Sequence, residues 1–451
     1  MSRSMTWGTA IGIALGVAYT ASPLTVWFAI AMAGLFAWAG RGLGEGERRM
    51  VWVVLAVGVG VRVFALALLF LLSDHALLTS FFWDGDGVYL KYRALVIRNV
   101  MAGIPVSQPD SFHAFDRGYG WSSYLYLLAY LQYLTGPAPF GIHLLNTALY
   151  MATAVILYRL VRPAYGRTPA LAGLAVMLLL PTLIAWSVSA LKESLYIFLC
   201  AVGLTAAVTV SRHPRLSARV AAIAVLAGVI AANGTVRTGA SAIMIAGLAA
   251  GLAASFIARR ALLVLLLVVL VPVAAVWLWE RPGIRTRVIE PLRTAAARHV
   301  GNVTTPGNSY RLLDRRNYET NGLQTMRPDE GRRFIGRALV SFVTVPLPWQ
   351  VESRAELVFL GQQVIWYIVV ILAGVGFIGG LRRDPLVTCL LAGVSAVGAA
   401  TIALNGGNVG TLVRFRDTVV PFVLWLGALG ATLALARAFP GRVTKRSAPC
   451  P

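Results

Sequence analysis

The chain has 451 residues, of which 58% are hydrophobic and 13% are charged, and its mean hydropathy is +0.72. Soluble domains carry about 25% charged residues, so this composition excludes an ordinary soluble protein. The net charge is +22. Basic cytoplasmic loops account for such an excess in membrane proteins, so we expect no nucleic-acid partner. We expect an all-α, polytopic membrane protein, since lipid offers the backbone no partner outside its own helix.

The hydropathy pattern predicts about twelve transmembrane helices. In chain order they are placed at residues 5–20, 22–39, 51–72, 140–160, 168–187, 189–210, 218–233, 238–257, 261–279, 355–380, 385–404 and 412–438. If the helices alternate, the arginine clusters of the short loops and the tail all fall on one side. The positive-inside rule makes that side cytoplasmic, so both termini are expected in the cytoplasm.

Two long stretches then face the outer side, at residues 73–139 and 281–354. The apolar, Tyr-rich piece at 124–134 in the first is too short for a span, and we expect an interfacial amphipathic helix there. The second contains thirteen arginines. We divide the chain into an N-terminal transmembrane hairpin (1–50), a core that includes the first outer loop (51–280), the second outer loop (281–354) and a C-terminal part (355–451).

The first outer loop opens with Phe81-Phe-Trp-Asp84-Gly-Asp86-Gly-Val-Tyr89, which follows the third predicted span by about ten residues. Two carboxylates in this spacing can ligate a divalent cation such as Mg²⁺ or Mn²⁺. One of them can instead act as the base that deprotonates a hydroxyl group. An Asp/Gly turn explains the same residues without any chemistry. The position beside a membrane surface makes Asp84 and Asp86 candidates for catalysis.

Several cations near the predicted outer face are not explained by the positive-inside rule. Lys192 and Glu193 lie in a turn between two spans, Arg237 lies in another, and Arg414 and Arg416 begin the last span. Snorkelling to the interface or pairing with a neighbouring acid explains each of them alone. Because ionisable groups at membrane depth are costly, the set predicts a site for the phosphate of a lipid headgroup.

Two further motifs have simpler interpretations. His113 and Asp116 are three residues apart, so they can share one helical turn as an acid/base or ligand pair, or they can lie in a plain surface loop. The glycines of residues 374–380 match a nucleotide-binding pattern, but they lie inside an apolar helix with no strand before it. They therefore indicate close helix packing.

The layout of the chain resembles the GT-C superfamily of integral membrane glycosyltransferases. A span, a long outer loop that opens on an acidic pair and a Tyr, amphipathic helices and then Ile142-His-Leu-Leu-Asn146 carry the resemblance. Pro346-Leu-Pro-Trp-Gln350, Asn408-Val-Gly-Thr411 and Arg414-Phe-Arg416 resemble uncharacterised bacterial members. The resemblance covers roughly residues 50–430 and rests on layout and short motifs. Glycines separate the acidic pair here, and two extra spans precede the core, which departs from the family pattern.

The resemblance implies an inverting transfer at the outer face of a bacterial cytoplasmic membrane. A sugar would move from a polyprenyl phosphate or pyrophosphate to a glycan, lipid or protein acceptor. Asp84 or Asp86 would be the base or a metal ligand. The residues expected to bind substrate or lipid phosphate are Tyr89, Lys91, His113, Asp116, Lys192, Glu193, Arg237, Arg311, Arg414 and Arg416.

Two other functions fit the same features. The first is an O-antigen or exopolysaccharide-type polymerase or ligase, whose chemistry would centre on Arg311 in the second outer loop. The second is a lipid or glycan transporter or flippase that performs no chemistry. Transporters place ionisable residues and broken helices at mid-membrane, often in repeated halves. The clustering of polar residues at one face and the lack of such halves in the sequence favour the transferase.

Overall fold

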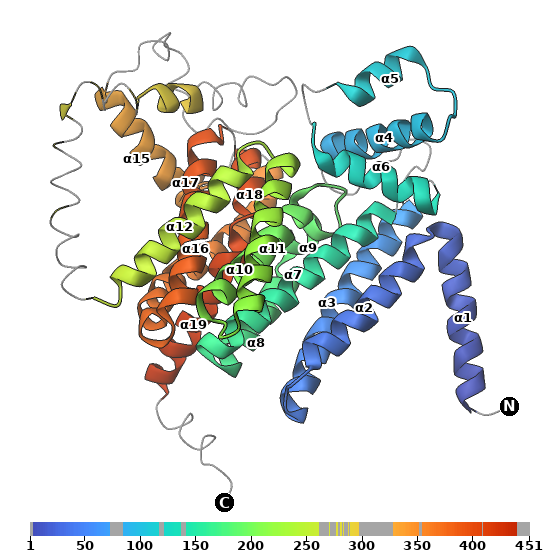
Figure 1. Cartoon of the computed structure of the whole chain (residues 1–451), viewed down its shortest axis with the longest axis horizontal. Helices are drawn as coiled ribbons and strands as arrows, with labels where there is room; N and C mark the ends of the chain where they lie inside the picture. Colours follow the sequence, from blue (N-terminus) through green and yellow to red (C-terminus); the bar gives the residue numbers. More distant parts are fainter. Residues whose placement is uncertain are drawn as a thin grey trace, which may run out of the picture. The chain divides into compact units, whose positions relative to one another are not determined.

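The computed structural model describes residues 3–72, 84–116, 121–136, 141–260, 289–296, 328–350, 354–407 and 409–439, with isolated positions between 270 and 287. Every regular element in these ranges is a helix (Figure 1), which confirms the expected all-α class for the described residues. The chain forms two compact units. Unit 1 contains residues 1–160 and 174–241, and unit 2 contains residues 161–173 and 242–451.

The helices of unit 1 begin with three that precede the first outer loop. They are α1 (Arg3–Ala21), α2 (Leu24–Gly40) and α3 (Glu45–Leu72), followed by α4 (Asp84–Met101), α5 (Gln108–Phe115), α6 (Ser123–Thr135), α7 (Gly141–Tyr165), α8 (Arg167–Leu179), α9 (Pro181–Ser187), α10 (Glu193–Arg212) and α11 (Leu216–Val236). The end of α7 and the start of α8 belong to unit 2.

Unit 2 contains most of the remaining helices. They are α12 (Ala240–Ile257), α15 (Pro328–Thr344), the short 3₁₀ helix η3 (Pro348–Gln350), α16 (Arg354–Arg383), α17 (Pro385–Asn405), α18 (Val409–Arg416) and α19 (Val420–Ala438). The expected span at 412–438 is wrong in its first part. A turn after α18 separates it from α19, which begins beside Pro421, and proline is suited to the first turn of a helix because it lacks an N–H.

Eight described helices are long and apolar enough to cross a membrane, namely α3, α7, α10, α11, α12, α16, α17 and α19. The α8–α9 pair makes a ninth if it is counted as one span, and it is bent by 63°. These helices confirm a polytopic membrane protein. Twelve spans remain a prediction, since α1 and α2 are helices outside this set and the expected span at 261–279 lies outside the described residues.

The arginines of the short loops gather at one end of the helices in unit 1. Arg159 at the end of α7 donates to the carbonyls of Trp38 and Arg41, at 2.9 and 3.0 Å, and so joins α7 to the α2–α3 loop. Lys192 precedes α10, whereas Arg212 ends it, and a helix of this length spans about 30 Å. We call the end of this unit that contains Arg159 and Arg212 the arginine end, and the opposite end, which contains Lys192, the site end.

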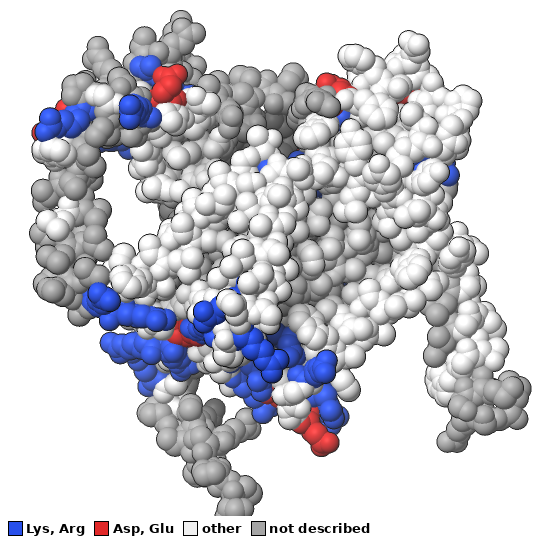
Figure 2. All heavy atoms as spheres, in the orientation of Figure 1, with Lys and Arg blue, Asp and Glu red and all other residues white. Residues whose placement is uncertain are grey.

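The middles of the long helices carry few charges. On the face seen in Figure 2, basic side chains lie near helix ends and leave the apolar lengths between them white. This pattern is typical of helices that cross a bilayer. The order of the arginine end and the site end agrees with the expected alternation of α3, α7, α10 and α11, while the identity of the membrane and the side that each end faces stay predictions.

Glycines bring α16 and α19 into close contact in unit 2. A Cβ atom added to Gly376 would lie 2.9 Å from the backbone nitrogen of Gly430, and one added to Gly430 would lie 2.9 Å from that of Gly376. Such small residues let two membrane helices approach closely. The expectation of a packing role for the glycines of residues 374–380 is therefore confirmed, whereas Gly374 itself faces open space.

We expect Gly430→Ala to lower the free energy of unfolding by about 1–3 kcal/mol, because the added methyl group forces the two helices apart. Gly374→Ala is the matched control, since nothing lies within 4 Å of its added Cβ atom. Thermal unfolding in detergent measures both. Equal melting temperatures for the two variants would contradict the packing described here.

Candidate functional site

Helices α4, α5 and α6 form a layer at the site end of unit 1, which we call the α4–α6 layer (residues 84–135). Figure 1 shows them lying beyond the ends of α3 and α7. Their apolar faces share one core, to which Leu90, Leu125 and Leu128 contribute from the layer, with Ile142 from α7 and Leu191 from the turn before α10. The expected helix at 124–134 is confirmed by α6. The layer is therefore packed onto the helices that follow it.

Arg93 holds the layer together. Its guanidinium group is buried and donates to the carbonyl oxygens of Ala114 at 3.0 Å and Asp116 at 2.6 Å. The same group lies 5.1 Å from the ring centre of Tyr89. A cation at the C-terminal end of α5 also stabilises that helix by its dipole. Arg93 thus joins α4 to the end of α5.

The turn at residues 188–192, between α9 and α10, is held by side chains of α7. Asn146 donates through Nδ2 to the carbonyl oxygens of Ser189 and Leu191, both at 2.7 Å. Nδ1 of His143 lies 2.6 Å from the carbonyl oxygen of Val188. Because a carbonyl oxygen only accepts hydrogen bonds, Nδ1 carries a proton, and both side chains are fully buried.

Two further side chains complete this support. The hydroxyl oxygen of Tyr124 lies 3.0 Å from Oδ1 of Asn146 and 3.5 Å from the carbonyl oxygen of Ala190. Thr147 donates to the carbonyl oxygen of Ser187 at 3.3 Å. Burial raises the pKa of Tyr124, so its hydroxyl stays protonated and available as a donor. Irregular backbone within a membrane protein needs such partners, because lipid supplies none.

The predicted cations of unit 1 gather around this turn. Lys91 on α4 is 1% exposed and is a charged neighbour of His143. Lys192 ends the turn, and Glu193, which is buried, begins α10 as expected for a turn between two spans. The guanidinium carbon of Arg237 lies 5.9 Å from the ring centre of Tyr196, one helical turn beyond Lys192. The structure therefore brings Lys91, Lys192, Glu193 and Arg237 to one region.

The acidic pair lies in a helix rather than in a turn. Asp84 and Asp86 belong to the first turn of α4, where carboxylates are favoured by the helix dipole. Asp86 and Tyr89 are half-buried, and the side chain of Asp84 is outside the described part. Among the residues searched, no three His, Cys, Asp or Glu side chains come together as a metal site. A metal at Asp84 and Asp86 stays a prediction.

His113 and Asp116 lie at the C-terminal end of α5, and whether they act as a pair stays a prediction. His113 lies in the last turn of α5, and Asp116 is the residue that ends the helix. Both side chains are exposed. The backbone carbonyl oxygen of Asp116 accepts a hydrogen bond from Arg93. A neighbouring acid, Asp110, accepts from the hydroxyl of Ser107, which lowers the pKa of that carboxyl.

Arg416 in unit 2 is buried and hydrogen-bonded within the protein. It is 1% exposed and donates to the carbonyl oxygens of Phe342 at 3.2 Å and Val345 at 3.0 Å, and to Oε1 of Gln363 at 2.7 Å. Burial lowers the pKa of Arg416 to about 10, so it stays charged at neutral pH and stabilises the end of α15. The structure thus gives Arg416 a structural role, and its expected phosphate contact stays a prediction.

The two other arginines expected at the site have different positions. Arg414 is half-buried, with its guanidinium carbon 5.6 Å from the ring centre of Phe415. Arg311 lies outside the described residues. Neither observation tests whether these side chains bind substrate.

A buried arginine lies in the middle of α3. Arg62 is fully buried and donates to Oγ of Ser187 at 2.7 Å, and to the carbonyl oxygens of Leu178 at 2.8 Å and Gly58 at 3.0 Å. Its guanidinium carbon also lies 5.0 Å from the ring centre of Tyr150. Arg62 therefore holds both sides of the break between α8 and α9.

The break itself follows from Pro181. Proline has no N–H, so the carbonyl oxygen of Met177, four residues earlier, has no helical partner. The hydroxyl of Tyr150 donates to that carbonyl at 3.0 Å instead. Neighbouring helices commonly satisfy the groups that a proline frees inside a membrane. Because α9 leads directly into the 188–192 turn, Arg62 and Tyr150 support the position of Lys192 and Glu193.

The sequence interpretation missed most of this framework. The predicted span at 51–72 includes Arg62 with no role of its own, and His143 and Asn146 enter the sequence prediction only through the resemblance. The signal was present in α7, since His143, Asn146 and Tyr150 recur at helical spacing and so share one face of that helix. Comparisons with protein-family models, with curated proteins and with solved structures find no match to this chain.

We expect Arg62→Met to lower the free energy of unfolding, because the Leu178 carbonyl and the Ser187 hydroxyl each lose a buried partner, which costs about 1–3 kcal/mol per group. Backbone amide exchange across residues 178–192 should also become faster. Arg49→Met on the same helix is the matched control, since Arg49 is exposed. Mass-spectrometric hydrogen exchange in detergent measures both, and equal exchange in the two variants would contradict the role of Arg62.

Proposed function

We propose that the protein is a membrane glycosyltransferase that takes a sugar from a polyprenyl phosphate or pyrophosphate. One observation carries the proposal. Acidic residues in the first turn of α4 and the cations around the 188–192 turn belong to the same end of unit 1, away from the arginine end. A transferase acting on a lipid phosphate needs both a carboxylate base and cations at the membrane surface.

In the proposed reaction, Asp86 or Asp84 removes the proton from an acceptor hydroxyl. The hydroxyl oxygen then attacks the anomeric carbon, and the bond between that carbon and the lipid phosphate oxygen breaks. The bonding electrons pass to the phosphate, whose negative charge grows in the transition state. Lys192 and Arg237 stabilise that charge. Attack from the face opposite the leaving phosphate inverts the anomeric configuration.

The half-burial of Asp86 supports its role. A partly buried carboxylate is shielded from bulk water, so it can take a proton from a bound hydroxyl in competition with solvent. Lys192 and Arg237 are also half-buried, which leaves part of each cation open to a lipid headgroup. Lys91, by contrast, is 1% exposed.

We expect Asp86→Asn or Asp84→Asn to lower kcat for transfer from a polyprenyl-linked sugar by about 10²–10⁴-fold, the usual contribution of a general base. Asp110→Asn is the matched control, because Asp110 is a half-buried acid on α5 of the same layer. The assay uses purified protein in nanodiscs with a labelled donor. Full activity in both Asp84 and Asp86 variants would refute the mechanism.

One observation favours a second candidate function, that of a lipid or glycan transporter. Arg62 lies deep within a span beside a helix that is bent by 63°, and transporters often build substrate sites from broken helices at mid-membrane. The hydrogen bonds of Arg62 to the broken backbone give it a structural role, which is why the transferase is preferred.

Proteoliposomes distinguish the two functions. With a fluorescent polyprenyl phosphate in the outer leaflet and no acceptor, we expect the rate of lipid crossing to match that of empty liposomes. Protein-dependent crossing without sugar transfer would support the transporter. When a polyprenyl-linked sugar and an acceptor are then added to the same proteoliposomes, we expect sugar transfer without accelerated crossing, since the proposed chemistry takes place at one membrane face.

A further inference from the structure

A pocket of about 450 Å³ lies at the site end of unit 1, between α2, α6 and α7. Its size falls within the range of small-molecule sites. The start of α7 packs against the chain just before α2, because a Cβ atom added to Gly141 would lie 2.6 Å from Oγ of Ser22. The lining residues are Leu24, Trp27, Phe28, Ala31, Leu131, Leu134, Thr135, Leu144, Leu145 and Ala148.

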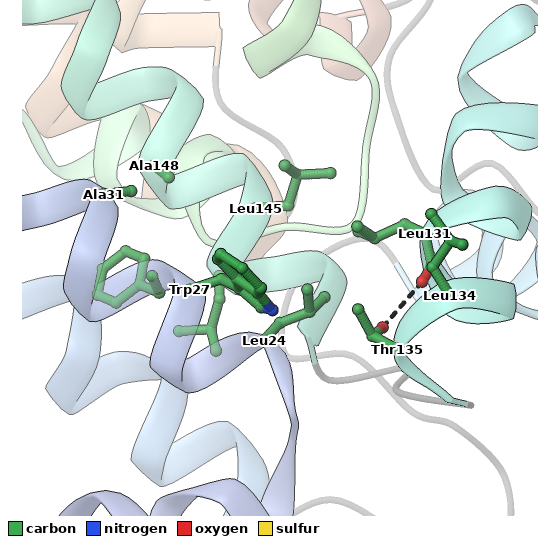
Figure 3. Close-up of a pocket in the computed structure, with 10 residues that line it drawn as sticks. Leu24, Trp27, Ala31, Leu131, Leu134, Thr135, Leu145 and Ala148 are labelled. Carbon is green, nitrogen blue, oxygen red and sulfur yellow. Dashed lines mark hydrogen bonds between the residues drawn. The ribbon is translucent and has the colours of Figure 1, made fainter.

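The lining of the pocket suits a hydrocarbon. Among the lining residues, Trp27 and Thr135 carry polar side-chain atoms. The hydroxyl of Thr135 already donates to the carbonyl oxygen of Leu131 at 2.8 Å. Figure 3 shows the side chains of Leu131, Leu134 and Thr135 on one side, with Trp27 and Leu24 facing them. A sugar, a nucleotide or a peptide backbone would leave its polar groups without partners here.

The pocket opens sideways toward the surface that lipid would cover. Trp27 is 62% exposed and Leu134 is 79% exposed. Trp residues favour the level of the lipid headgroups, which suits Trp27 near the start of α2. At the other end, Figure 3 shows Ala31 of α2 beside Ala148 of α7. These two small side chains leave space between the helices for an apolar chain.

The charged residues at the site end indicate which kind of headgroup the lipid carries. The first two turns of α7 carry Leu144, Leu145 and Ala148 toward the pocket, and His143 and Asn146 toward the 188–192 turn. Lys91 is a charged neighbour of His143, and Lys192 ends that turn. A lipid whose chain entered the pocket would therefore have its headgroup at the same end of unit 1 as these cations, which favours an anionic group such as phosphate.

We propose that this pocket binds the hydrocarbon chain of a polyprenyl phosphate. The inference rests on the proposed function and places the carrier lipid on α2 and α7. A polyprenyl phosphate has one chain for each phosphate, whereas a phospholipid has two, and the pocket is one recess between three helices. The N-terminal helix α2 thereby becomes part of a binding site, because it supplies four of the ten lining residues.

The test uses a polyprenyl phosphate that carries a benzophenone on its chain, added to the purified full-length protein in nanodiscs without acceptor. After illumination, peptide mass spectrometry locates the cross-links. We expect them on α2, α6 and α7. Ala31→Phe fills the pocket and should lower cross-linking at these helices by at least tenfold. Ala33→Phe on the same helix is the matched control, since Ala33 is exposed and does not line the pocket.

Ala148→Phe provides a second filled variant from α7, so the result does not depend on the folding of one protein. Equal cross-linking in Ala31→Phe, Ala148→Phe and Ala33→Phe would overturn the proposal. A benzophenone phosphatidylglycerol that labels the same peptides equally well would also overturn it, because ordinary bilayer lipid would then be the occupant. Sugar transfer is not measured in this assay. If a separate assay with a polyprenyl-linked sugar and an acceptor finds no transfer by the unaltered protein while its cross-linking is intact, the proposed function is refuted and the pocket assignment stands.

Discussion

The structure depends on one constraint, which is that each backbone carbonyl at membrane depth must have a hydrogen-bond donor. Pro181 removes one donor from the α8–α9 span, and the 188–192 turn leaves several more carbonyls outside a helix. The buried polar side chains of α3, α6 and α7 supply these donors. The position of Lys192 and Glu193 follows from that arrangement. The candidate site is thus built around a break in a helix.

The same principle operates in unit 2. There Arg416 and Gln363 reach the end of α15, together with the indole of Trp366, which donates to the carbonyl oxygen of Val343 at 3.1 Å. The hydroxyl of Tyr367 donates to the carbonyl oxygen of Thr344 at 2.6 Å. The C-terminal end of α15 is thus held by hydrogen-bond donors from α16 and α18. Arginine is well suited to this task, because its planar group donates in several directions while remaining charged.

Hydropathy predicted the helical class and the position of most spans, because lipid burial leaves an apolar signal in every window. It also predicted the turn at Lys192 and the packing role of the glycines near Gly376. It did not predict the bend at Pro181, since the apolar pattern continues through it. The role of Arg416 was missed because its partners are backbone carbonyls more than 70 positions away in the chain. Glycines alternate with Asp84 and Asp86, so the sequence allowed a turn there, yet residues 84–87 all belong to α4.

The burial of Arg62 has a consequence for how the chain is made. Its partner Ser187 is 125 residues further along, so α3 leaves the ribosome long before its charge can be satisfied. At a synthesis rate of about 5–20 residues per second, that interval is about 6–25 s. An arginine at the centre of a helix opposes membrane insertion by about 2.5–3.5 kcal/mol. The strong apolarity of the rest of α3 offsets this cost, and the helix completes its assembly when α9 arrives.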